Sequence, residues 1–240
     1  MIVQLSCDIR LGYVMNRLLW FVIRTEIVKQ CVARSNMLKG QLYTTGLQYG
    51  ALADAMLEVS REVFVPDAFA GSAYVDDVIA LGGGRYMLSP HMLATMLDAV
   101  EFEGHERTLI IGGGTGYSAE VVKHLCDKVV MVEERADLVS KARAQVEDVD
   151  VNTAPLSSGC AVHQPYDVII IEGAVEKVPQ VLLDQLVDGG RLVTVESAGV
   201  LAKGQVLVIE KHGDAYSELR GEQLSIPALA GFSENEEFSF

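Results

Sequence analysis

The sequence has few basic residues, and this scarcity excludes one large class of partner. Its 240 residues hold 19 Lys and Arg against 33 Asp and Glu, which gives a formal net charge of −14 and a pI near 4.7. Nucleic-acid phosphates are recognised by clustered Lys and Arg side chains, which this chain lacks. We therefore expect small molecules or protein segments, and no nucleic acid, as its ligands.

The cysteines and histidines show no metal-binding or disulfide pattern. The four cysteines are scattered with no CxxC spacing, and the five histidines stand at no metal-ligand intervals. The sequence therefore predicts no structural metal and a reduced, cytoplasmic setting.

Long hydrophobic runs are also missing. The most apolar N-terminal stretch, GYVMNRLLWFVI, is interrupted by Asn16 and Arg17, is too short to span a bilayer and is not followed by an A-x-A cleavage site. Residues 1–40 carry six basic and two acidic side chains, a charge of +4, so the remaining residues carry −18. We expect residues 1–32 to be an extension, either an amphipathic helix docked on the body or on a second subunit, or a disordered segment. A membrane is not an expected partner, and the oligomeric state stays open.

From residue 50 onward, helix and strand patterns alternate. Helices are predicted over 50–65, 89–100, 119–127, 137–147 and 178–188, and strands over 107–113, 128–134, 166–173 and 189–197. Strands that alternate with helices form a parallel sheet with both faces covered, and the apolar run at 168–171 suits a central strand. The chain is thus predicted to be α/β and doubly wound, with a C-terminal antiparallel hairpin over 204–226.

Four glycines follow the first of these strands, in TLIIGGGTGYSAEVV. Glycines between a strand and a helix let the backbone approach a ligand closely, although they can also serve only a tight turn. Glu133 ends the next strand, 21 residues beyond Gly112, where a carboxylate accepts both hydroxyls of a ribose. Together the two features predict a nucleoside-binding site.

The spacing of the glycines narrows the choice of nucleoside. Dinucleotide-binding proteins use G-x-G-x-x-G, whereas this chain has Gly112-x-Gly114-x-Gly116 followed by Tyr117. The tighter spacing suits a ligand without a pyrophosphate, and it disfavours a nicotinamide-dependent oxidoreductase.

At this point the sequence resembles the S-adenosylmethionine-dependent methyltransferases, and among them the protein-L-isoaspartate O-methyltransferases. The resemblance covers residues 33–240 and is carried by EVSREVFVPDAF, SPHM, GGGTGYSAEVV, PYDVIIIEGA and above all VPQVLLDQLVDGGRLV. It implies a Rossmann-like core over 108–240, a helical substrate region over 33–107, S-adenosylmethionine as cofactor, and methyl transfer to an isoaspartyl carboxylate in damaged proteins.

The resemblance also implies roles for individual residues. The expected cofactor-binding residues are Gly112, Gly114, Thr115, Gly116, Tyr117, Glu133 and Glu172, and the expected catalytic residues are Ser89 and His91. Ordinary roles compete with these: Ser89 is a plausible N-cap for a helix that begins at Pro90, His91 could be a surface residue, and Glu172 could face solvent.

The chain departs from the family pattern at three places. Ile110 stands where relatives carry Glu or Asp for the cofactor's amino group, Leu88 stands where they carry Ser, and NTAPLSSG replaces an adenine-contacting Asp-Gly. Losing one charge-assisted hydrogen bond costs about 1.5–3 kcal/mol, roughly ten- to a hundredfold in affinity. Two readings therefore remain: a methyltransferase that is slow, or a binding or regulatory protein of the same family.

Overall fold

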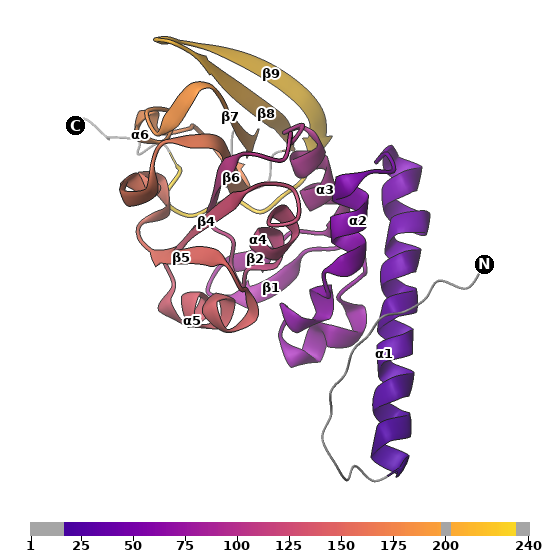
Figure 1. Ribbon diagram of the computed structural model, residues 1–240. Coiled ribbons are helices and arrows are strands. Elements are labelled where there is room, and N and C mark those ends of the chain that lie inside the picture. The colour runs from indigo at the N-terminus through magenta and orange to yellow at the C-terminus, as the bar shows by residue number, and fades with distance from the viewer. Residues whose placement is uncertain (1–16, 198–202, 234–240) are drawn as a thin grey trace.

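The computed structural model describes residues 17–197 and 203–233, and a seven-stranded sheet forms its centre (Figure 1). The sheet order is β5-β4-β3-β6-β7-β8-β9. The strands are β3 (Arg107–Ile111), β4 (Lys128–Glu133), β5 (Val149–Thr153), β6 (Tyr166–Val175), β7 (Leu186–Glu196), β8 (Gly204–His212) and β9 (Ala215–Leu224). The first five sheet positions pair in parallel, and β8 and β9 form an antiparallel hairpin at one edge, which confirms the predicted fold class.

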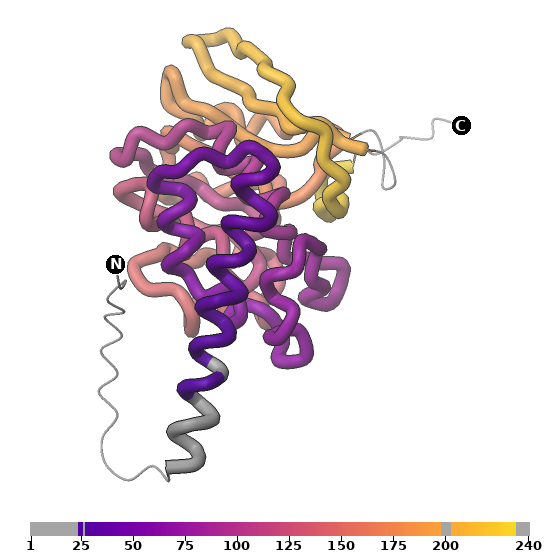
Figure 2. The backbone as a smooth tube through the Cα atoms, turned by 90° about the vertical axis from the view of Figure 1, so that its right-hand side faces the viewer, coloured from indigo at the N-terminus to yellow at the C-terminus, as the bar shows by residue number. Residues whose placement is uncertain are grey.

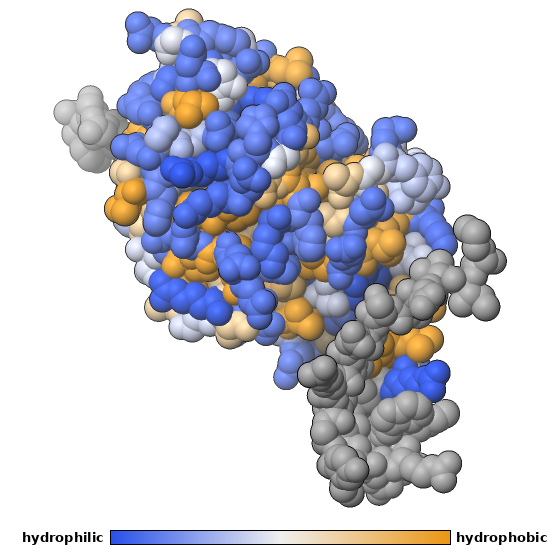
Figure 3. Space-filling model, in the orientation of Figure 1, coloured by the Kyte–Doolittle hydropathy of each residue, from blue (hydrophilic) through white to orange (hydrophobic). Residues whose placement is uncertain are grey.

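The central strand is the apolar run that the sequence singles out. Nine of the ten residues of β6 are buried, and Asp167 alone is only half-buried. A parallel strand covered on both faces can be apolar throughout, because neither side meets water. The outer strand β9 is the opposite case: it is exposed along nearly its whole length, and Figure 3 shows mostly hydrophilic residues over this end of the molecule.

The two faces of the sheet are covered unequally. Ile110 and Met131 face a core that includes residues of α2 (Ala51–Glu58), α3 (Pro90–Asp98), α4 (Tyr117–Val122) and α5 (Ala136–Gln145). The opposite face, with Leu109 and Val130, packs against α6 (Gln180–Leu183) and the segment that follows β9. Because α6 has only four residues, short 3-10 turns and loops complete this second layer.

Two predicted helices are shorter than their sequence patterns. The helix expected over 178–188 ends at Leu183, since Leu186 already pairs with Tyr166 as part of β7. The helix expected over 50–65 ends at Glu58, where the guanidinium of Arg34 donates to the carbonyls of Leu57 and Glu58 and satisfies the last turn. Tertiary contacts override helical periodicity in both cases.

The N-terminal segment is helical. α1 (Arg17–Met37) is a 21-residue helix whose C-terminal part lies beside α2 (Figures 1 and 2), and Figure 1 shows the helix reaching beyond the rest of the fold. This helix continues through the predicted domain boundary at residue 32 without a break. Residues 1–16 lie outside the described part of the chain. A separate N-terminal extension over residues 1–32 therefore stays a prediction. No helix within the described ranges is long and apolar enough to cross a membrane.

Candidate active site

The four-glycine loop joins β3 to α4 at the carboxyl edge of the sheet. Gly112, Gly114 and Gly116 have φ angles of 80°, 57° and 98°, which side-chain-bearing residues rarely adopt, so these positions require glycine. The whole loop from Gly112 to Gly116 is buried.

Two of the glycines serve packing. A Cβ at Gly113 would lie 3.0 Å from the sulfur of Met131, and one at Gly116 would lie 2.8 Å from a methyl carbon of Val146. These two positions let β4 and α5 pack closely against the loop.

The other two glycines meet a hairpin that the sequence did not predict. The hairpin consists of β1 (Ile79–Gly82) and β2 (Arg85–Met87), and it lies over the glycine loop. A Cβ at Gly112 would lie 2.6 Å from Nη2 of Arg85, and one at Gly114 would lie 2.8 Å from a methyl carbon of Leu81. The space that these glycines leave open is therefore filled by the chain's own side chains.

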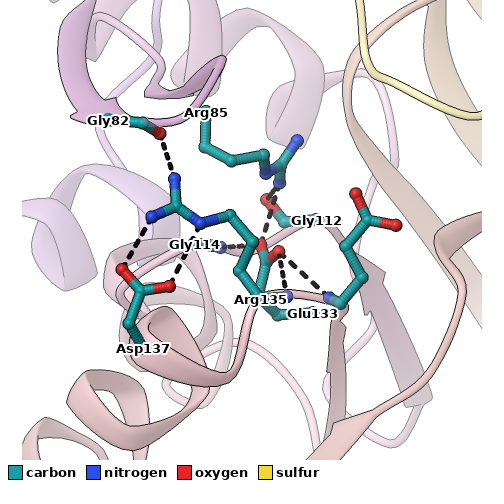
Figure 4. A network of polar contacts seen from close by, with 8 residues as sticks. Gly82, Arg85, Gly112, Gly114, Glu133, Arg135 and Asp137 are labelled. Atoms are coloured by element: carbon teal, nitrogen blue, oxygen red, sulfur yellow. Dashed lines mark hydrogen bonds and ion pairs between the residues drawn. The ribbon is translucent and has the colours of Figure 1, made fainter.

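Glu133 ends β4 beside this loop and is completely buried. Its Oε1 accepts hydrogen bonds from the backbone N–H groups of Glu134 (3.0 Å) and Arg135 (3.2 Å). Its Oε2 accepts from the N–H of Gly114 (3.2 Å) and from Nη2 of Arg85 (3.0 Å), as Figure 4 shows. The carboxylate is thus fixed at the strand end, and Arg85 balances its charge.

A second arginine ties the hairpin to α5. Nη1 of Arg135 donates to the carbonyl of Gly82, while its Nε and Nη2 donate to the two carboxylate oxygens of Asp137 at 3.1 and 2.7 Å (Figure 4). Sequence reasoning missed both arginines. The one available signal was that Arg85 follows directly on three glycines, Gly82 to Gly84.

Glu172 lies on the other side of Gly112. Ile111 pairs with Val132 on β4 and with Ile171 on β6, so Glu133 and Glu172 both come one residue after these pairs and project from the same face of the sheet. Two carboxyl groups therefore flank the first glycine of the loop.

Glu172 is buried among both apolar and charged side chains. Its side chain is 9% exposed, and with Arg85, Leu88 and Leu229 it lines a cavity of about 10 Å³. Burial raises the pKa of Glu172 to about 7, while the Ser118 hydroxyl and the charge of Arg85 oppose this effect. Within the described ranges, the atoms Glu172 Oε1 and Arg85 Nε have no hydrogen-bond partner, which marks a place where a polar ligand group or a water would fit.

The residues that follow the glycines are buried as well. Thr115 donates its hydroxyl to the carbonyl of Phe64 at 2.6 Å. Tyr117 packs its ring against the guanidinium of Arg61, whose Cζ lies 4.8 Å from the ring centroid, and the Tyr117 hydroxyl has no partner among the described residues. Thr115 thus positions the loop, and Tyr117 lies buried against the guanidinium of Arg61.

Ser89 and His91 lie at the start of α3. Ser89 is buried and its Oγ accepts from the N–H of Met92 at 3.2 Å, which confirms it as the N-cap before Pro90. The ring of His91 faces a groove of about 260 Å³, where its Nε2 lies 3.6 Å from Glu222 of β9. Among the described residues no hydrogen bond links Ser89 or His91 to Glu133, and the catalytic roles of both stay predictions.

Two of the three departures from the family pattern, Ile110 and Leu88, lie in the buried interior. Ile110 is fully buried in β3 between Met131 of β4 and Ile170 of β6. Leu88 is 2% exposed and faces the small cavity beside Glu172.

In the residues that the structure describes, no group of three or more His, Cys, Asp or Glu side chains could hold a metal ion.

A mostly parallel sheet with a glycine loop after β3 and a buried carboxylate at the end of β4 defines a Rossmann-like nucleoside-binding protein. Comparison with known proteins narrows this class. The family model described as protein-L-isoaspartate(D-aspartate) O-methyltransferase matches residues 33–224, so the chain belongs to this family.

Relatives and solved structures agree with this assignment. A protein-L-isoaspartate O-methyltransferase of Methylorubrum populi is 36% identical over 165 residues, which is 67% of this chain and 78% of that protein. One of Methanoregula boonei is 32% identical and covers 82% of this chain and 93% of that protein. A solved protein-L-isoaspartate O-methyltransferase is 25% identical, with a TM-score of 0.71 over 82% of this chain and 66% of that one. A Plasmodium falciparum structure, solved with S-adenosyl-L-homocysteine, is 16% identical with a TM-score of 0.69 and supports the fold alone.

Proposed function

We propose that this chain is an S-adenosylmethionine-dependent methyltransferase that forms methyl esters on isoaspartyl carboxylates of protein or peptide substrates. The observation that carries the proposal is the buried carboxylate of Glu133, which accepts a hydrogen bond from the N–H of Gly114 at the carboxyl edge of the sheet, in a chain that belongs to this family from residue 33 to 224. We also propose that the chain acts in the cytoplasm, in keeping with its lack of a predicted disulfide pattern.

The site offers groups that fit this cofactor. Glu133 would accept the ribose hydroxyls, as carboxylates at this position do in Rossmann-like folds. Gly112 and Gly114 would allow the close approach, and the unpaired atoms of Tyr117 and Glu172 would meet the polar methionine portion. A buried negative charge at Glu172 would also offset a positively charged ligand. The remaining predicted contacts, Thr115 and Gly116, would act through the shape of the loop.

The reaction requires little chemical participation from protein side chains. When bound, S-adenosylmethionine supplies a methyl group that is already electrophilic because it is attached to a sulfonium. An isoaspartyl carboxylate with a pKa of roughly 4 is ionised at neutral pH, so no general base has to remove a proton. The protein contributes by orienting the carboxylate and by excluding water, and Leu88 and Leu229 form an apolar wall suited to that task.

Replacing Glu133 tests the cofactor site. We expect Glu133→Gln to weaken the binding of S-adenosylhomocysteine by about tenfold or more, because hydrogen bonds to a charged group contribute about 1.5–3 kcal/mol. Isothermal titration calorimetry of the wild type and the variant measures this change. The matched control is Glu134→Gln, one residue further along and exposed, which should bind like the wild type. Equal binding by both variants would move the site away from the end of β4.

A further inference from the structure

Arg85 lies over the proposed cofactor site, and the role given to it here rests on that proposed function. The guanidinium of Arg85 is only 4% exposed, and all its described hydrogen bonds come from Nη2. One goes to the carbonyl of Gly112 at 2.6 Å and the other to the carboxylate of Glu133 at 3.0 Å. These are the two residues on which a nucleoside would lie.

The guanidinium also fills the space over the glycine loop. Nη2 lies 2.6 Å from the position that a Cβ of Gly112 would take, so a ligand cannot approach Gly112 while Arg85 is in place. Leu81, on the same hairpin, blocks Gly114 in the same way. A ligand therefore has to displace residues of this hairpin before it can reach Glu133.

The turn between β1 and β2 has features of a segment that can be displaced. Gly82, Gly83 and Gly84 all have positive φ angles, of 88°, 55° and 76°, which leaves the turn without side chains to anchor it. Its main tie to α5 is the bond from Arg135 to the carbonyl of Gly82 (Figure 4). Arg85 itself is incompletely satisfied, because its buried Nε has no partner among the described residues.

We propose that Arg85 is an internal competitor of the cofactor: in the free chain its guanidinium occupies the ribose position on Glu133, and cofactor binds only after this ion pair opens. Arg85 is then the residue that sets cofactor affinity. If the open form makes up a fraction f of the free chain, the apparent Kd equals the intrinsic Kd divided by f, so a site that is nine-tenths closed loses about tenfold in affinity.

Removing the guanidinium is the direct test. We expect Arg85→Gln to bind S-adenosylhomocysteine about tenfold more tightly than the wild type in isothermal titration calorimetry, because Glu133 keeps its backbone hydrogen bonds and loses its competitor. Arg85→Lys keeps a positive charge near Glu133 and supports folding, and it should fall between the two. The matched control is Arg220→Gln on β9, an exposed arginine paired with Glu196 and Glu218, which should leave the Kd unchanged.

The outcomes separate this proposal from the proposed function. Binding by the wild type that is equal or tighter than binding by both Arg85 variants would overturn the competitor role, since Arg85 would then be neutral or a cofactor contact. If neither the wild type nor any folded variant binds S-adenosylhomocysteine, the cofactor site itself is wrong, and the competitor role falls with it. Tighter binding by Arg85→Gln, with Arg220→Gln unchanged, is the result that supports it.

Discussion

Replacing Arg61 with leucine is expected to lower the free energy of unfolding by about 2–4 kcal/mol. Arg61 is fully buried, its Nε donates to the carbonyl of Ala73 at 2.7 Å, and its Nη2 donates to the carbonyl of Leu88. Leucine would leave both carbonyls buried without a donor, at about 1–3 kcal/mol each, and relief from burying the guanidinium would offset part of that loss. Urea denaturation monitored by circular dichroism measures the difference.

A surface arginine provides the control for Arg61. Arg107 also donates its guanidinium to a backbone carbonyl, that of His163 at 3.3 Å, but it is exposed, so Arg107→Leu should change stability by no more than about 0.5 kcal/mol. A loss below about 1 kcal/mol for Arg61→Leu would mean that the two carbonyls find other donors. The carbonyl of Leu88 would then not depend on Arg61 for its place beside the cavity.

Replacing Glu172 with glutamine is expected to stabilise the protein by about 3 kcal/mol at pH 8 and to have little effect near pH 4.5. Burial raises the pKa of Glu172 to about 7 from its ordinary value of 4.5. The folded chain therefore holds an extra proton between these two values, and its stability falls as the pH rises from 4.5 to 7. A difference of about 2.5 pH units corresponds to about 3 kcal/mol, which is lost in full above pH 7.

Glutamine avoids this loss because it stays neutral at every pH. Urea titrations of the wild type and Glu172→Gln at pH 4.5, 6 and 8 should show a difference in unfolding free energy that grows with pH. Glu134→Gln, at an exposed position, should show no such trend. A difference that is the same at all three pH values would contradict the raised pKa, and a variant less stable at pH 8 would indicate that Glu172 is stabilised as an anion.

Patterns within short segments predicted much of the fold. The apolar run at 168–171 indicated a central parallel strand because a strand buried on both faces carries apolar side chains on both of them. Ser89 indicated a helix start because a serine before a proline can accept from the first turn. The 21-residue spacing from Gly112 placed Glu133 at the glycine loop, where its carboxylate accepts from the N–H of Gly114.

Contacts between distant segments explain what the patterns missed. Arg85 is 48 residues from Glu133 in the sequence, and no local sequence pattern near either residue indicates that the two side chains form an ion pair. The hairpin of β1 and β2 is short and rich in glycine, so it shows almost no alternation of apolar and polar residues. The glycine spacing indicated either a loop that a ligand approaches or a tight turn, and it gave no sign that Arg85 and Leu81 lie over the loop.

The most direct test of the proposed function is methyl-ester formation on a defined peptide. Purified protein is incubated at mildly acidic pH, where the ester survives, with labelled S-adenosylmethionine and a peptide that contains one isoaspartyl residue. The matched peptide has an ordinary aspartyl residue at the same place, and Glu133→Gln is run in parallel. We predict label in the isoaspartyl peptide alone, at a slow rate in the wild type and at least tenfold less in the variant at limiting cofactor. Equal labelling of both peptides, or no ester in either at saturating cofactor, would contradict the assignment of this chain as an isoaspartyl methyltransferase.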